Sequence, residues 1–148
     1  KMRDIKYIAV HCTASSQTTT IRGLEMEFKR KGWKNPGYHY VVSADGVIHQ
    51  MLDEEKVSNG VKGWNSRLIN VAYIGGLDAT GKAIDNRTEA QKKSMKALLK
   101  QLKGRYPKAV IRGHRDFSPD LNGDGKITRN EWIKACPCFD AGEEYKDI

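Results

Sequence analysis

The chain has 148 residues, 39% of them hydrophobic, and 26 basic and 18 acidic side chains give it a formal net charge of +8. This length predicts one domain over residues 1–148, large enough to bury roughly 70% of its unfolded surface without disulfide staples. Its apolar stretches are far shorter than the roughly 20 residues of a membrane-spanning helix, so we expect no membrane partner. The charged and apolar segments of a secretory signal peptide are not seen at its start.

The first half of the chain predicts strands separated by one helix and one long loop. Residues 5–10 form an apolar run typical of a buried strand, and a helix over 21–31 follows a group of capping threonines. Strands over 38–42 and 47–50 are joined by an Asp-Gly turn, which is typical of a hairpin. The polar, glycine-interrupted residues 53–67 are predicted to form a surface loop.

The second half adds a strand over 71–74, a helix that Thr88 caps and that extends to about Lys103, and a last strand over 109–112. Apolar residues recur along the helix at helical spacing, namely Met95, Leu98, Leu99 and Leu102. Strands with intervening helices and one hairpin predict an α/β fold with a mixed central β-sheet flanked by helices. The ends of such strands and the adjoining loops commonly carry the chemistry.

Two histidines follow predicted strands, and a cysteine lies near the end of the chain. His11 follows the strand over 5–10, His114 follows the strand over 109–112, and Cys136 lies in a short Cys-Pro-Cys segment. Two imidazoles and one thiolate are ligands that zinc prefers, and three protein ligands leave a fourth position open for water, as in a catalytic site. Because the three residues are far apart in the sequence, their spacing alone does not establish the site.

Five short motifs surround these residues in a fixed order: VHCTA (10–14), GYHYVV (37–42), IGG (74–76), RGH (112–114) and KACP (134–137). This order resembles the zinc-dependent N-acetylmuramoyl-L-alanine amidases of type 2, which include phage amidase lysozymes and peptidoglycan recognition proteins. The resemblance runs from about residue 4 to about residue 140. It implies the fold of that family, Zn²⁺ held by His11, His114 and Cys136, and hydrolysis of the amide between N-acetylmuramic acid and L-alanine in peptidoglycan.

The resemblance also implies two catalytic residues beside the zinc. Tyr38 matches a family tyrosine whose phenol could hydrogen-bond water or help a proton to leave. Lys134 matches a lysine that points at the reacting carbonyl, where an ammonium group would stabilise the oxyanion. The chain departs from many relatives over 57–65, where they often carry a histidine, and this leaves substrate contacts from the loop open. Trp64 and Asn65 match the end of that loop and either line the groove or, for Trp64, form a buried anchor.

The segment between His114 and Cys136 contains a full match to the twelve-residue EF-hand calcium loop, DLNGDGKITRNE (120–131). Gly125 would allow the sharp turn, and Lys126 would offer its backbone carbonyl. The other expected ligands are oxygen atoms of Asp120, Asn122, Asp124, Thr128 and Glu131. The alternative is a polar turn without a metal, since no long helix is predicted before the loop. A bound Ca²⁺ would be structural and would fix the spacing between the zinc ligands.

The chain has three cysteines, and an odd number argues against a complete disulfide framework. Cys12 alternates away from His11 along its strand and is expected to be a small buried hydrophobe. Cys138 could pair with Cys12 under oxidation, and the sequence leaves this open.

The sequence thus predicts a zinc-dependent enzyme acting on peptidoglycan, and a non-catalytic peptidoglycan-binding module is the alternative. Relatives that lost catalysis lack the zinc cysteine, whereas Cys136 is present. The basic charge could be a solvated surface or could attract a polyanion. Nucleic acid is not an expected partner, because aromatic and basic residues are not interleaved as in a stacking platform. A monomer is favoured, and the localisation and the biological role are not predicted.

Overall fold

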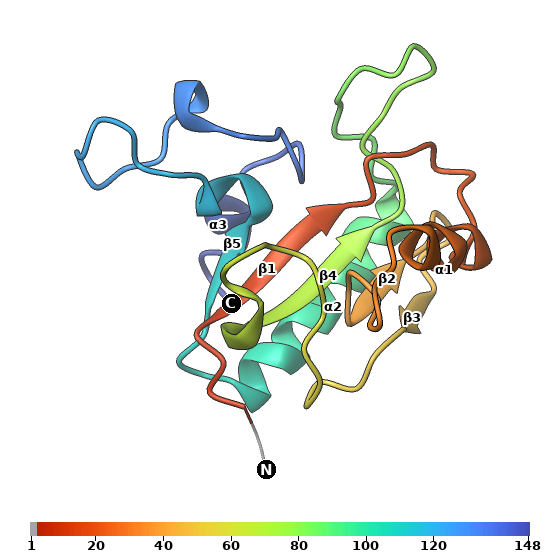
Figure 1. Ribbon diagram of the computed structural model, residues 1–148, viewed down its shortest axis with the longest axis horizontal. Coiled ribbons are helices and arrows are strands. Elements are labelled where there is room, and N and C mark those ends of the chain that lie inside the picture. Colours follow the sequence, from red (N-terminus) through yellow and green to blue (C-terminus); the bar gives the residue numbers. More distant parts are fainter. Residues whose placement is uncertain (1–2) are drawn as a thin grey trace.

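The computed structural model describes residues 3–148 and contains one mixed five-stranded sheet with helices on both faces (Figure 1). The strands are β1 (Tyr7–Cys12), β2 (Tyr40–Val42), β3 (Ile48–Gln50), β4 (Leu68–Tyr73) and β5 (Val110–Gly113), and the helices are α1 (Ile21–Arg30), α2 (Glu89–Arg105) and α3 (Ala141–Glu144). Their order in the sheet is β3-β2-β4-β1-β5, with β3 antiparallel to β2 and the other pairs parallel. The predicted α/β fold is confirmed.

The two faces of the sheet are covered by different elements because side chains alternate along each strand. One face carries Ile8 and Val10 of β1 and packs against the apolar stripe of α2, which passes behind the sheet in Figure 1. The predicted stripe of Met95, Leu98, Leu99 and Leu102 is buried. The opposite face packs Ala72 of β4 against Leu24 and Phe28 of α1. This second face also carries the site described below.

Both long helices begin directly after the threonines that were predicted to cap them. The Thr20 side chain accepts a hydrogen bond from Gly23 N at the start of α1. At α2, Thr88 and Gln91 form a reciprocal capping box, in which each side chain satisfies a backbone N–H of the other.

Several predicted boundaries were wrong, and one short helix was missed. β1 covers Tyr7–Cys12 rather than residues 5–10, so His11 lies within the strand rather than after it. β4 begins at Leu68 rather than at residue 71, because its six residues all pair with β1 although a polar asparagine interrupts the apolar run. β2 begins at Tyr40 rather than at residue 38. The sequence prediction also missed α3, whose four residues are too few for a helical period and whose start is fixed by Asp140 accepting from Glu143 N. Within residues 3–148, none of the helices is long and apolar enough to cross a membrane.

Candidate active site

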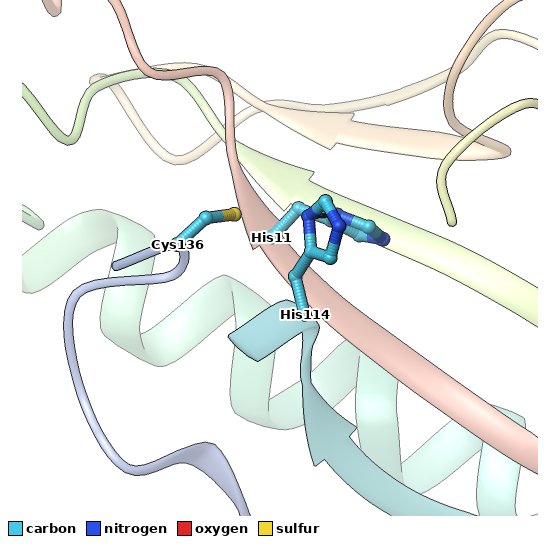
Figure 2. Close-up of side chains that lie close together, drawn as sticks. All are labelled: His11, His114 and Cys136. Carbon is cyan, nitrogen blue, oxygen red and sulfur yellow. Dashed lines mark hydrogen bonds between the residues drawn. The ribbon is translucent and has the colours of Figure 1, made fainter. Parts of the chain in front are cut away.

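The two predicted histidine ligands meet because their strands are neighbours. β1 and β5 run parallel with Val10 opposite Gly113, so His11, near the end of β1, and His114, directly after β5, lie at the same end of the sheet. There the Nδ1 atoms of His11 and His114 lie 3.2 Å apart, and the ring centroids lie 4.8 Å apart. Figure 2 shows the two rings packed against each other beyond the end of β5.

Cys136 reaches the histidines from the C-terminal segment (Figure 2). That segment is held by a hydrogen bond from Arg115 N to the Cys136 carbonyl oxygen, 2.8 Å long. The Cys136 sulfur accepts a hydrogen bond from the backbone N–H of Cys12 at 3.1 Å. The possible ligand atoms of His11, His114 and Cys136 all lie within 4.8 Å of one another, so the structure brings the three predicted ligands together.

The surroundings keep both imidazoles neutral, which is the form that binds metals. Burial lowers the pKa of His11 to about 4. Burial, together with the nearby charges of His11 and Lys134, lowers the pKa of His114 to about 3. Two nitrogen atoms bound to one tetrahedral zinc at about 2.0 Å lie roughly 3.3 Å apart, and the observed separation of 3.2 Å matches that value. The donor set therefore fits a zinc ion.

A cavity of about 220 Å³ opens over this group, and its lining includes all five residues predicted for zinc binding and catalysis, namely His11, Tyr38, His114, Lys134 and Cys136. The Tyr38 hydroxyl donates to the Cys12 carbonyl oxygen at a long distance of 3.4 Å, and its ring lies 5.2 Å from that of His11. Burial raises the pKa of Tyr38 well above its usual value, so its phenol stays protonated. Lys134 is exposed. The catalytic roles of Tyr38 and Lys134 stay predictions.

A second cavity of about 490 Å³ adjoins the first and shares Trp33, Asn59, Gly60, His114 and Lys134 with it. The two cavities therefore form one continuous groove along the loop after residue 57. Asn65 lines the larger cavity, and its Oδ1 shapes the loop by accepting from Gly60 N and Val61 N at 3.1 and 2.7 Å.

Of the two roles that the sequence left open for Trp64, the packing favours the anchor, with the ring half-buried rather than buried. It does not line either cavity of the groove. Instead it packs edge-on against Tyr7 and Phe117, with ring centroids 5.8 and 5.3 Å away.

The calcium-loop match at 120–131 adopts a tight turn. Carboxylate oxygens of Asp120, Asp124 and Glu131 lie within 4.8 Å of one another. Both oxygens of Glu131 accept hydrogen bonds within the loop, from the backbone N–H groups of residues 121, 122 and 128. The preceding residues 114–117 form a 3-10 turn, so the loop lacks the first helix of an EF-hand, as expected. Calcium binding by this loop stays a prediction.

Sequence reasoning missed the residues that contact the predicted ones from other elements. The main omission is Asn70 of β4, whose Oδ1 lies 2.8 Å from His11 Nε2. An amide inside a buried strand was the available signal. Glu27, Lys31 and Trp33 also line the smaller cavity. The sequence contains no signal that separates these residues in and just after α1 from other residues at the end of a helix.

Comparison with known proteins gives a consistent result. Residues 1–137 match the family model described as N-acetylmuramoyl-L-alanine amidase. An uncharacterized protein of Haemophilus influenzae is 47% identical over 96 residues, covering 65% of this chain and 83% of that protein. The endolysin of Enterobacteria phage K11 is 34% identical over 142 residues, covering 95% and 85%. The Ph2119 endolysin from Thermus scotoductus MAT2119 bacteriophage Ph2119 superposes with a TM-score of 0.70 at 26% identity, covering 93% and 79%.

Proposed function

We propose, from the premise that this chain belongs to the N-acetylmuramoyl-L-alanine amidase family, that it is a zinc-dependent enzyme which hydrolyses the amide between N-acetylmuramic acid and L-alanine in peptidoglycan. One observation carries the proposal. The imidazoles of His11 and His114 and the thiol of Cys136 converge at the floor of a groove that also contains Tyr38 and Lys134.

His11 and His114 would hold the zinc through Nδ1, and Cys136 through its sulfur. When bound, zinc supplies Lewis-acid chemistry, since it polarises a carbonyl group and makes water acidic near neutral pH. The backbone N–H of Cys12 donates to the Cys136 sulfur and so helps to orient that sulfur toward the two histidines.

Lys134 is proposed to stabilise the negative charge that develops on the carbonyl oxygen of the substrate. Its position in both cavities supports this role, because a substrate that crosses from one cavity to the other passes its ammonium group. Tyr38 is proposed to place water or to deliver a proton. Its protonated phenol and its long hydrogen bond to Cys12 support this, because the hydroxyl is held only weakly by the protein.

The alternative is a module that binds peptidoglycan without cleaving it. The presence of the complete His11, His114 and Cys136 group favours the enzyme. A protein that served only for binding would not need a metal at the groove floor.

Mass analysis of purified peptidoglycan after incubation with the protein tests the proposal. We expect free stem peptides that begin with L-alanine, together with glycan chains that have lost their peptides. A chelator should abolish both products, and added Zn²⁺ should restore them. If the protein sediments with insoluble peptidoglycan but no peptide is released in the presence of Zn²⁺, the protein is a binding module and the enzyme proposal is wrong.

A further inference from the structure

We infer that Asn70 is a positioning residue that fixes the orientation and the tautomer of His11, and that Gly60 is what makes room for it. The inference rests on the proposed metal function. It deepens that function by assigning a role to a residue outside the predicted ligands and catalytic groups.

The register of the sheet places the two side chains on one face. β1 and β4 run parallel, with Ala9 opposite Asn70 and His11 opposite Ala72. Residues two apart along a strand share a face, so Asn70 is the diagonal neighbour of His11. The Asn70 side chain is fully buried, and a buried amide is costly unless its donors and its acceptor are satisfied.

The partners of Asn70 show which of its atoms faces His11. Its Nδ2 donates to the Ser58 hydroxyl oxygen at 2.7 Å, and its Oδ1 lies 2.8 Å from His11 Nε2. An amide oxygen only accepts, so His11 Nε2 carries the hydrogen. A neutral imidazole has one N–H and one lone pair, and the lone pair of His11 is therefore on Nδ1, which faces His114.

His39 determines the direction of the whole chain of hydrogen bonds. Its Nδ1 accepts from the backbone N–H of Asn70 at 3.0 Å, and a backbone N–H can only donate. Its Nε2 then carries the hydrogen, which the Lys56 carbonyl oxygen accepts at 2.7 Å, and the guanidinium of Arg3, 3.2 Å from Nε2, finds no acceptor there. His39 Nδ1 therefore has the lone pair, and the Ser58 hydroxyl, 3.0 Å away, donates to it. With its hydrogen used in this way, the Ser58 oxygen accepts from Asn70. A flipped Asn70 amide would leave the Ser58 oxygen without this donor.

Gly60 leaves the space that the amide occupies. A Cβ atom at residue 60 would lie 2.4 Å from both Cγ and Oδ1 of Asn70, which is far inside contact distance. Any larger side chain at this position would displace the Asn70 amide from His11. The loop that lines the groove is thus matched to the residue beneath it.

The metal-free protein offers a direct test that does not depend on activity. Nitrogen-15 NMR of the histidine rings should show His11 protonated at Nε2 and unprotonated at Nδ1 in the wild type. In Asn70→Leu, which has similar volume and no acceptor, the tautomers should become mixed, whereas Asn70→Asp should keep the wild-type form. A wild-type His11 protonated at Nδ1 would overturn the inference even if no variant folds.

Zinc affinity, measured by competition with a chromophoric chelator, gives the second readout. Loss of such an outer contact typically weakens metal binding roughly 10–100-fold, and we expect this for Asn70→Leu and Gly60→Ala. The matched controls are Gln91→Leu, a buried amide that bonds Val42 and Ile74 away from the site, and Gly104→Ala on α2, which has open space. Unchanged affinity in Asn70→Leu would overturn the inference, whereas a wild type that binds no zinc would instead overturn the proposed function.

Discussion

The Nδ1 atoms of His11 and His114 lie 3.2 Å apart although 103 positions separate the two residues in the chain. The parallel pairing of β1 with β5 brings them together, and the hydrogen bond between Arg115 and Cys136 adds the thiol. The geometry of the site therefore depends on the sheet rather than on any local segment. Each prediction below tests one part of this arrangement.

Removal of the thiol should remove the metal. We expect about one zinc per chain in protein purified without added metal, and loss of most of it in Cys136→Ala, because two imidazoles alone form an incomplete site. Cys138→Ala is the matched control, since this nearby thiol is not part of the ligand group. Elemental analysis provides the measurement, and full zinc content in Cys136→Ala would show the assignment to be wrong.

Lys134→Ala should retain zinc and the fold but lose activity. The loss of one contact to an oxyanion typically costs about 3 kcal/mol, or roughly a hundredfold in kcat. Lys100→Ala on α2, which covers the opposite face of the sheet, is the control for removal of one positive charge. Turnover of a muramoyl-peptide substrate at the wild-type rate by Lys134→Ala would exclude the proposed role.

Tyr38→Phe separates the hydroxyl from the aromatic ring. The ring packs in the core beside Phe28, so the melting temperature should change little when only a 3.4 Å hydrogen bond is removed. If the phenol takes part in proton transfer, kcat should fall roughly a hundredfold or more, with unchanged zinc content. Full activity would mean that Tyr38 is only a core aromatic.

Arg87 connects the segment before α2 to α3, and its loss should destabilise the protein. Its side chain is 2% exposed and forms ion pairs with Asp85 and Glu144 at 2.9 and 2.6 Å. Because the two carboxylates are themselves 30% and 40% exposed, we expect the loss of these charged hydrogen bonds to cost about 2 kcal/mol, or a fall of roughly 4–8 °C in Tm for a domain of this size. The exposed Arg105, paired with Glu54, gives the control variant Arg105→Met, for which thermal unfolding should show a loss below about 1 kcal/mol.

The same network predicts a pH dependence. Burial alone would raise the pKa of Asp85, but the hydrogen bond and charge of Arg87 outweigh it and lower the pKa below its usual 3.8. A carboxyl group whose pKa is lower in the folded protein than in the unfolded protein stabilises the fold at pH values above the unfolded pKa. This contribution is lost as the pH falls through the folded pKa. The stability difference between wild type and Arg87→Met should therefore be constant near neutrality and shrink below about pH 4. A difference that grows in acid would contradict this account.

The sequence predicted the sheet and the two long helices because each leaves a local signal, whereas the three zinc-binding candidates depended on the resemblance of the surrounding motifs to a known family. Capping threonines marked the starts of α1 and α2, and apolar runs marked β1, which contains His11, and β5, which His114 follows. The motif around Cys136 then supplied the third candidate. These signals depend on neighbours in the chain and need no knowledge of the tertiary structure.

The contacts of Asn70 could not be predicted in the same way. They depend on the register of β1 against β4 and on the loop that places Ser58 and Gly60 above the strand. A polar residue in an apolar run reads locally as a strand boundary, which is why the start of β4 was predicted too late. The amide is tolerated in the buried strand because Ser58, His39 and His11 satisfy it.

Calcium should stabilise the protein through the loop at 120–131. The carboxylates of Asp120, Asp124 and Glu131 already lie within 4.8 Å of one another, and an ion that binds only the folded state stabilises it by about 2.7 kcal/mol at a hundredfold excess over Kd. For a domain of this size, Tm should rise by several degrees. Mg²⁺ should do less, because it demands strict octahedral geometry and loses its water reluctantly.

Glu131→Gln should abolish most of this rise, because the amide cannot replace a bidentate carboxylate. The control is Asp78→Asn, which alters a half-buried aspartate in a different turn and should leave the calcium effect intact. Activity should fall only partly in Glu131→Gln, since the loop supports the segment before Cys136 without contributing to the lining of the smaller cavity. If calcium leaves the Tm of chelator-stripped protein unchanged, residues 120–131 are a polar turn whose glutamate serves only to accept backbone hydrogen bonds.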